Sequence, residues 1–280
     1  MDMIFKQKVE TALAAMGEKV LSYEEEAAEP TAEAYAYIES YAYEKKLYNT
    51  LLALPLVRGF MLAPADKKVT FRKDFGKEKA YYKHCLAVAR MLIDLEIPIS
   101  DEETDIILAA AICHIMRELI AFPGRAEELT TIYHLDPRVF ETVKLVTRDD
   151  PLPEKEQRLF YQRIQGNKLA LLVRLADRGN LVEQLYGMSL WDAQEYIRET
   201  RTYFFPMCIY GKEHFADIRT IINLLMEKMR TLIEVADILS TRYQEREVEI
   251  TKDILDLQEE NSRLRGFIAT LEEEKKSIEG

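Results

Sequence analysis

Three side chains of types that bind metal ions lie in strongly apolar parts of this sequence. They are His84 within an apolar helical pattern, His114 in the middle of the most apolar segment (residues 106–116), and Asp177 at the end of a further apolar run. Taken singly, a buried histidine is usually satisfied by a backbone carbonyl, and an aspartate after an apolar run often caps a helix. A buried carboxylate is nevertheless costly unless it is paired or bound to a metal ion. Three such groups on three separate buried helices therefore predict a metal site inside a helical bundle.

The elements that position these residues are predicted to be helices. Only 10 glycines and 9 prolines occur among 280 residues, which argues against a turn-rich all-β fold. Ser100 and Glu103 have the spacing of a capping box, and Asp136 before Pro137 is typical of a helix start. We expect further helices at residues 31–54, 81–97, 157–164, 168–177 and 191–205, with Pro123–Gly124 ending the central helix and Pro206 ending the last. The expected fold class is all-α.

The C-terminal part of the sequence changes from a wide apolar stripe to a narrow one. Residues 213–242 carry the broad stripe of a helix that docks on a core. From residue 243 the apolar positions follow a heptad, with Ile254, Asn261, Ile268 and Lys275 at position a and Ile250, Leu257, Leu264, Leu271 and Ile278 at position d. Isoleucine at a, leucine at d and one asparagine at a are preferred by parallel two-stranded coiled coils. We expect residues 243–280 to form a homodimeric coiled coil; a single solvated helix and pairing with another chain are the alternatives.

Composition excludes several classes of partner. The chain has 38 Lys and Arg against 49 Asp and Glu, a net charge of −11, so nucleic acid and anionic membrane surfaces are not expected partners. No apolar segment reaches the roughly 18 residues of a transmembrane helix, and the N-terminus lacks a signal-peptide pattern. The odd, widely spaced set Cys85, Cys113 and Cys208 suits reduced thiols. We expect a cytoplasmic location.

The same residues carry a resemblance to a known family. Tyr81-x-x-His84, then an apolar helix with His114, then Leu-Ala-Asp177-Arg resembles the HD-superfamily phosphohydrolases. More narrowly, the chain resembles the (p)ppGpp hydrolase domain of the RelA/SpoT enzymes. Further segments that agree in order and spacing are Tyr133–Asp136, Val143–Arg148, Tyr161–Ile164 and Lys168–Arg178, so that the resemblance covers about residues 45–210.

The resemblance implies a domain organisation, a metal and a ligand. Residues 31–212 would form an HD-domain helical bundle, preceded by a helical arm at 1–30 and followed by the docking helix and the coiled coil. His84, His114 and Asp177 would bind Mn²⁺ or another divalent metal, although a metal-free state is the alternative. A guanosine polyphosphate-like nucleotide would be the ligand.

The sequence departs from the family pattern at two acidic positions. In the family, the residue that follows the second His is an Asp that binds the metal, and in this sequence that position is Ile115. Leu119 replaces one member of the family's acidic pair. Glu118, the other member, is retained and would be the catalytic residue of an active enzyme. Replacing a carboxylate that binds the metal directly by an aliphatic side chain removes both a negative charge and a donor oxygen. We therefore expect impaired turnover.

Two further residues are candidates for nucleotide binding. Asn180 lies one position before Leu181, where the family has an Asn that contacts the nucleotide, and Arg117 could receive a phosphate or neutralise Glu118. Without a metal, His114 and Asp177 still need partners, and we expect a hydrogen bond between this histidine and the carboxylate, direct or through water.

Three functions remain open from the sequence. The leading expectation is a degenerate RelA/SpoT-like HD-domain protein, catalytically impaired, that acts in regulation by binding a nucleotide or a protein. The first alternative is an active metal-dependent pyrophosphohydrolase of (p)ppGpp or a related nucleotide. The second is a scaffold in which the bundle serves only to present the coiled coil.

Overall fold

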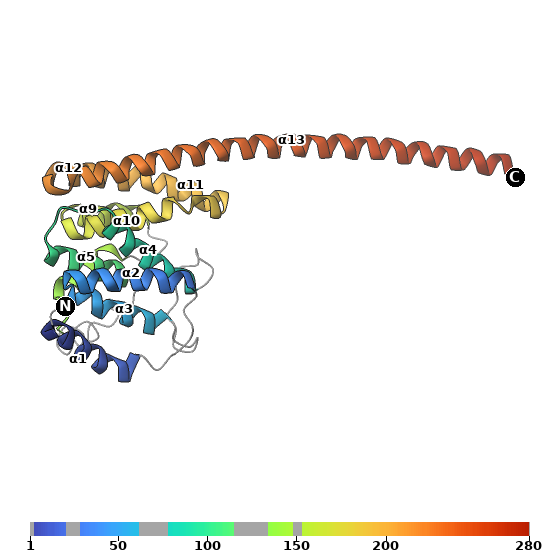
Figure 1. Cartoon of the computed structure of the whole chain (residues 1–280). Coiled ribbons are helices and arrows are strands. Elements are labelled where there is room, and N and C mark those ends of the chain that lie inside the picture. Colours follow the sequence, from blue (N-terminus) through green and yellow to red (C-terminus); the bar gives the residue numbers. More distant parts are fainter. Residues whose placement is uncertain (1–2, 21–28, 62–77, 115–133, 148–152, 280) are drawn as a thin grey trace. The chain divides into compact units, whose positions relative to one another are not determined.

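The computed structural model describes residues 3–20, 29–61, 78–114, 134–147 and 153–279. The regular elements of these residues are all helices, with no strand, which confirms the predicted all-α class (Figure 1). The elements in chain order are α1 (Met3–Val20), α2 (Glu29–Lys45), α3 (Tyr48–Met61), α4 (Glu78–Asp94), α5 (Asp101–Cys113), α8 (Pro137–Val146), α9 (Glu154–Gln165), α10 (Lys168–Val182), η3 (Leu185–Gly187), α11 (Leu190–Glu199), η4 (Thr200–Phe204), α12 (Phe205–His214), η5 (Ala216–Ile218) and α13 (Arg219–Glu279). Among the described residues, none of these helices combines the length and apolar character needed to cross a bilayer.

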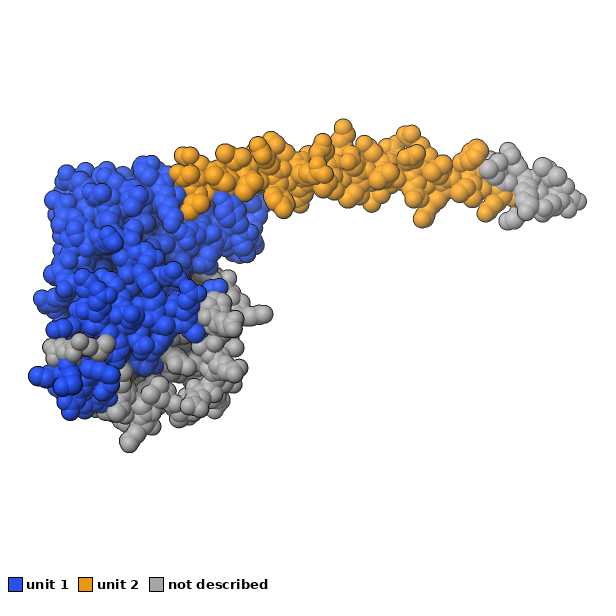
Figure 2. All heavy atoms as spheres, in the orientation of Figure 1, with its two compact units in different colours: residues 1–230 blue, residues 231–280 orange. Residues whose placement is uncertain are grey.

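The chain divides into two compact units, residues 1–230 and 231–280 (Figure 2). The first unit holds every element from α1 to the start of α13, and the second consists of the remainder of α13. Residues 219–242 of the expected docking helix and residues 243–279 of the expected coiled-coil segment belong to one helix of 61 residues, α13, and residues 213–218 precede it.

Helix α5 forms the centre of the first unit. It packs against α3, α4, α8 and α10, and every residue from Asp105 to Cys113 is buried. The predicted capping box at its start is confirmed, because Ser100 Oγ accepts a hydrogen bond from Glu103 N and Glu103 Oε2 accepts one from Ser100 N. An α-helix that is apolar on every side needs neighbours on every side, and α5 has them.

A buried carboxylate fastens three helices to one another. Asp105 of α5 accepts hydrogen bonds from the backbone N–H groups of Asn49 and Thr50, in the first turn of α3. Asn49 in turn accepts a hydrogen bond from the N–H of Asp136, at 2.7 Å. Asp136 caps α8, as predicted, by accepting from Arg138 N at 2.9 Å. These contacts satisfy N–H groups that a helix start leaves without intrahelical partners.

The prediction of one helix over residues 31–54 is wrong. The chain forms α2 and α3, separated at Lys46, which has a left-handed backbone with φ of 58°. Leu47 N then donates to Ala42 O at 2.8 Å, and the Leu47 side chain is buried. Tertiary packing therefore breaks the helix here, although the sequence has no Gly or Pro at this point. Pro55, conversely, lies inside α3 and does not end it.

The prediction of a helix that ends before Pro206 is also wrong. After α11 the chain passes through a π-helical turn, η4, and continues as α12 with Pro206 in its first turn. A proline is tolerated there because the first turn of a helix has no intrahelical acceptor for its N–H.

Candidate metal centre

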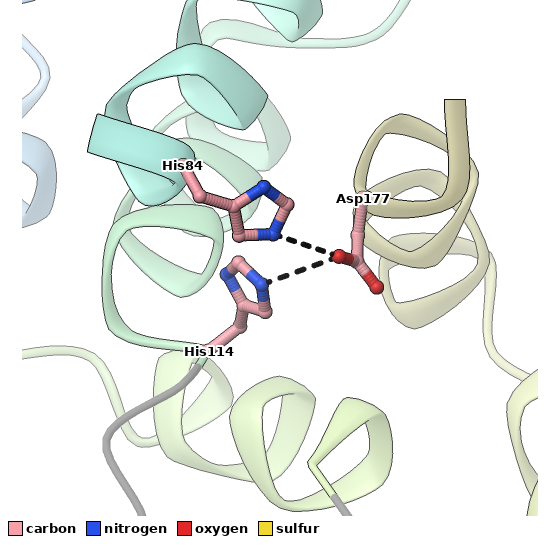
Figure 3. A group of neighbouring side chains, drawn as sticks. All are labelled: His84, His114 and Asp177. Atoms are coloured by element: carbon pink, nitrogen blue, oxygen red, sulfur yellow. Dashed lines mark hydrogen bonds and ion pairs between the residues drawn. The ribbon is translucent and has the colours of Figure 1, made fainter. Parts of the chain in front are cut away.

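The three predicted ligands come together at the meeting point of three helices (Figure 3). His84 lies on α4, His114 directly follows α5, and Asp177 lies on α10. One possible ligand atom from each residue lies within 4.8 Å of the others, and all three side chains are buried. The Nε2 atom of His84 is 2.9 Å from Asp177 Oδ1, and that of His114 is 3.6 Å from the same oxygen. The expected convergence is confirmed. The direct hydrogen bond expected between His114 and Asp177 is not formed, because their atoms are 3.6 Å apart; His84 lies at hydrogen-bond distance from the carboxylate instead.

His114 differs from its predicted position in the middle of a helix. Helix α5 ends at Cys113, and His114 is its C-cap. The backbone carbonyl of His114 accepts a hydrogen bond from Thr147 Oγ1 at 2.6 Å, just after α8.

The hydrogen bonds of each histidine fix which ring nitrogen carries the hydrogen. His114 Nδ1 lies 2.6 Å from the carbonyl oxygen of Ala111, which can only accept. His84 Nδ1 lies 2.8 Å from Asn180 Oδ1, an oxygen that also accepts from Gln184 Nε2 at 3.0 Å. Both Nδ1 atoms therefore donate, and in neutral imidazole both Nε2 atoms are left as acceptors.

Three acceptor atoms thus converge on one buried point. The two Nε2 lone pairs face the same carboxylate oxygen, and His114 Nε2 is buried without a hydrogen-bond partner. Acceptors placed in this way need a proton or a cation between them. Histidines that bind metals in proteins commonly donate their other N–H to a carbonyl or amide oxygen, as both histidines do here. The residues present therefore fit a divalent metal ion.

The charge state of Asp177 suits the same interpretation. Burial alone would raise the pKa of this carboxyl, but the positive charge of Arg174 lowers it, and the pKa lies well below the ordinary value. Arg174 pairs with the other carboxylate oxygen, Oδ2. Asp177 is therefore ionised inside the protein, with one oxygen facing the histidines and the other facing a guanidinium.

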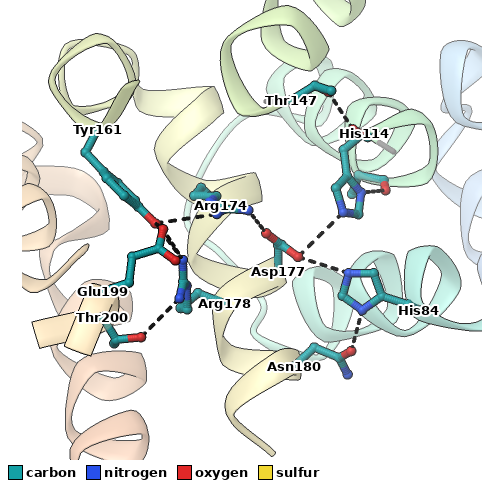
Figure 4. A network of polar contacts seen from close by, with 11 residues as sticks. His84, His114, Thr147, Tyr161, Arg174, Asp177, Arg178, Asn180, Glu199 and Thr200 are labelled. Carbon is teal, nitrogen blue, oxygen red and sulfur yellow. Dashed lines mark hydrogen bonds and ion pairs between the residues drawn. The ribbon is translucent and has the colours of Figure 1, made fainter. Parts of the chain in front are cut away.

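A second polar cluster lies beyond Arg174, and the sequence analysis did not identify it (Figure 4). Arg174 Nη2 is 3.5 Å from the hydroxyl of Tyr161, which also contacts Arg178 and Glu199. Arg178 pairs with Glu199 at 3.1 Å and donates to Thr200 Oγ1 at 3.1 Å. All five side chains are buried, so these hydrogen bonds and ion pairs offset the cost of removing their charges from water.

The other predicted site residues divide into two groups. Asn180 lies in the cluster, where it orients His84. Glu118 and Arg117, together with Ile115 and Leu119, lie outside the described residues. Within the part of the chain that the structure describes, His84, His114 and Asp177 are the one group that could hold a metal ion.

Comparison with known proteins gives no relative of this chain. No protein-family model matches the sequence, and neither a curated protein nor a solved structure matches it.

Proposed function

We propose that this chain is a degenerate HD-type protein that binds a divalent metal ion at His84, His114 and Asp177. Through that ion it holds a phosphorylated nucleotide, of the guanosine polyphosphate type, as a regulatory ligand. The observation that supports the proposal is the convergence of two imidazole Nε2 atoms and one ionised carboxylate oxygen in a buried site. Two histidines and a carboxylate are a ligand set found for first-row divalent metals.

Each residue of the site has a part in this function. His84, His114 and Asp177 would hold the ion, while Asn180 and the carbonyl of Ala111 keep the two imidazole rings in orientation. The ion, when bound, would supply positive charge to phosphate oxygens and would acidify a bound water. Arg174 limits the negative charge that Asp177 offers.

The chain's own residues support binding over turnover. Activation of water requires a group that accepts a proton, and the family pattern provides an acidic pair for this purpose. Here Ile115 and Leu119 replace two of the family's acids, and Glu118 is the one that the sequence retains. Within the described part of the cluster Asp177 is the one carboxylate, and its second oxygen is already paired with Arg174.

Metal titration tests the binding site directly. We expect purified protein to bind one Mn²⁺ per chain in calorimetry, and His84→Gln or His114→Gln to weaken binding by about 100-fold or more, beyond the loss typical of a supporting residue. His214→Gln is the matched control, because His214 is exposed and outside the cluster. A wild-type chain that binds no divalent ion, even after loading with Mn²⁺, would contradict the proposal.

Nucleotide assays separate binding from catalysis. With Mn²⁺ present we expect ppGpp to bind the wild-type protein and to remain intact. The double variant Ile115→Asp/Leu119→Asp restores the acids of the family pattern and is expected to gain hydrolysis. Release of pyrophosphate by the wild type on the order of once per second or faster would instead support the active enzyme, with Glu118 as its catalytic residue.

A homodimer through the C-terminal helix is the second part of the proposal. Side chains of the described residues 241–269 are exposed, among them Ile250, Ile254, Leu257, Leu264 and Ile268 of the heptad seam. An apolar seam of this type on a helix of 61 residues is stabilised when a second helix covers it. Asn261, at position a, would favour a two-stranded parallel pair. In the scaffold alternative this pairing would be the whole function.

A further inference from the structure

A groove separate from the metal centre lies between α9, the π-helical turn η4 and the start of α12. Its volume is about 680 Å³, and its lining includes Lys155, Arg158, Tyr161, Gln162, Gln165 and Tyr203. All of its lining residues belong to the first compact unit. The groove wall on α9 is one face of that helix, because its members recur at spacings of three and four residues.

The wall on α9 changes in chemistry along its length. Lys155 and Arg158 lie near the start of the helix, Tyr161 lies in the middle, and Gln162 and Gln165 lie at its end. At a rise of about 1.5 Å per residue this face is about 15 Å long. Cations at one end and amides at the other suit a ligand with a phosphate at one end and a hydrogen-bonding heterocycle at the other.

Two parallel tyrosine rings lie within the same groove. The ring centroids of Tyr161 and Tyr203 are 6.1 Å apart, and the ring planes differ by 4°. Tyr203 belongs to η4, and its hydroxyl donates to Glu154 Oε1 at 3.1 Å. That contact engages one oxygen of Glu154, the one carboxylate of the lining, and Glu154 keeps its charge. Lys155 and Arg158 together outweigh it and give the lining a net positive charge. Aromatic faces of this kind stack on planar heterocycles, and π-helical turns are frequent at functional sites.

We propose that this groove binds a nucleoside phosphate, at a site distinct from the metal centre, and that it communicates with the metal centre through Tyr161. The phosphate lies against Lys155 and Arg158, and the base lies against Tyr203. Tyr161 forms part of the groove, and its hydroxyl is 3.5 Å from Arg174 Nη2. Arg174 pairs with Asp177, so two side chains, Tyr161 and Arg174, connect the groove to the proposed metal ligand.

The coupling rests on the proposed metal function, whereas binding in the groove does not. A ligand that moves the Tyr161 hydroxyl changes the position of Arg174, and therefore the charge that Asp177 offers to a metal. By linkage, occupancy of either site then changes the affinity of the other by the same factor.

The first test uses full-length protein in excess EDTA, so that a metal cannot hold the probe. Calorimetric titration with GMP is expected to show one site. Arg158→Ala and Tyr203→Leu are each expected to weaken binding about tenfold or more. Arg163→Ala is the matched control, because Arg163 is an exposed cation of α9 outside the groove lining. Circular dichroism confirms that each variant is folded.

The second test measures coupling. The Mn²⁺ affinity of the wild type is expected to change about fivefold or more between GMP-free and GMP-saturated protein, a factor typical of allosteric coupling. Tyr161→Phe keeps the ring and removes the hydroxyl, so it is expected to lose this change when measured at a GMP concentration that saturates the variant. GMP is chosen because a monophosphate chelates Mn²⁺ weakly.

Each outcome decides a separate statement. Absence of GMP binding in EDTA, or binding that Arg158→Ala and Tyr203→Leu leave unchanged, overturns the groove. Equal Mn²⁺ affinity with and without GMP, or a change that persists in Tyr161→Phe, overturns the coupling. A wild type that binds GMP but no Mn²⁺ overturns the proposed metal function and the coupling, and leaves the groove established.

Discussion

Asp177 uses its two carboxylate oxygens for two different partners. Oδ1 faces the histidines and Oδ2 pairs with Arg174, and all of these side chains are buried. A fixed positive charge at this position competes with any cation for the same carboxylate. The affinity of the centre for a metal therefore depends on Arg174 as well as on the three ligands.

Replacing Arg174 tests this competition. Arg174→Met is expected to raise the affinity for Mn²⁺ about tenfold, equivalent to about 1.4 kcal/mol. Without a metal, the same variant is expected to be less stable than the wild type, because Asp177 loses its compensating charge. Calorimetry and thermal unfolding with and without Mn²⁺ measure both effects. Arg174→Lys retains the charge and is the control; equal affinities for Met and Lys variants would refute the competition.

The depressed pKa of Asp177 predicts a loss of stability in acid. Because its pKa is lower in the folded than in the unfolded protein, its contribution is complete above the unfolded value of about 3.9 and is lost as pH falls through the folded value. Metal-free wild type is therefore expected to lose unfolding free energy steeply below about pH 4. The variant Asp177→Asn lacks the carboxyl and therefore this pH-dependent part of the unfolding free energy. Urea titrations across the acid range should give a flatter curve for the variant, and parallel curves would count against the assignment.

Residue types alone were sufficient to predict that His84, His114 and Asp177 come together, but not what surrounds them. Arg174 lies three residues before Asp177, a spacing that places both on one face of a helix, so the sequence held a signal for this pair. The sequence held no such signal for the contact of Tyr161 with Glu199, because these residues lie on different helices 38 positions apart. Only the packing of α9 against η4 and α12 brings the two together.

At the scale of elements, local rules predicted helix starts better than helix breaks. The caps at Ser100 and Asp136 depend on neighbours within three residues, and both are confirmed. The break at Lys46 depends on burial of Leu47 and on Asp105, which binds the start of α3 from 55 residues away. No pattern within residues 31–54 contains that information.

The contact between α10 and α12 depends on a glycine. A Cβ atom on Gly211 of α12 would lie within 2.2 Å of a methyl carbon of Leu171, a fully buried residue of α10. Overpacking of this kind costs about 1–3 kcal/mol, which exceeds the gain of about 1 kcal/mol in helix propensity.

Gly211→Ala is therefore expected to lower the free energy of unfolding by up to about 2 kcal/mol. Gly166→Ala is the matched control, because a Cβ there meets nothing within 4 Å and the backbone is right-handed. Urea unfolding measures both variants. Equal stabilities would show that α10 and α12 separate at little cost.

At the scale of the whole molecule, the proposed dimer depends on a narrow seam formed by heptad positions a and d. Leu257 lies at position d, whereas Leu255 lies at position b and is similarly exposed, at 59% against 64%. Leu257→Lys is expected to convert a dimer to a monomer in light scattering, because it places a charge in the apolar seam. Leu255→Lys adds the same charge outside the seam and is expected to leave the dimer intact. A monomeric wild type, or equal effects of both substitutions, would contradict the heptad register.

The sequence distances within the metal centre have a consequence for folding. His84 is 93 residues from Asp177 and 96 from Asn180, so the cluster exists only after very long loops have closed. Closing loops of this length costs chain entropy before any contact within the cluster can stabilise the folded chain. Fragments and nascent chains that lack α10 would hold no such cluster, and a bound ion would therefore report that the chain extends at least through α10 and has folded.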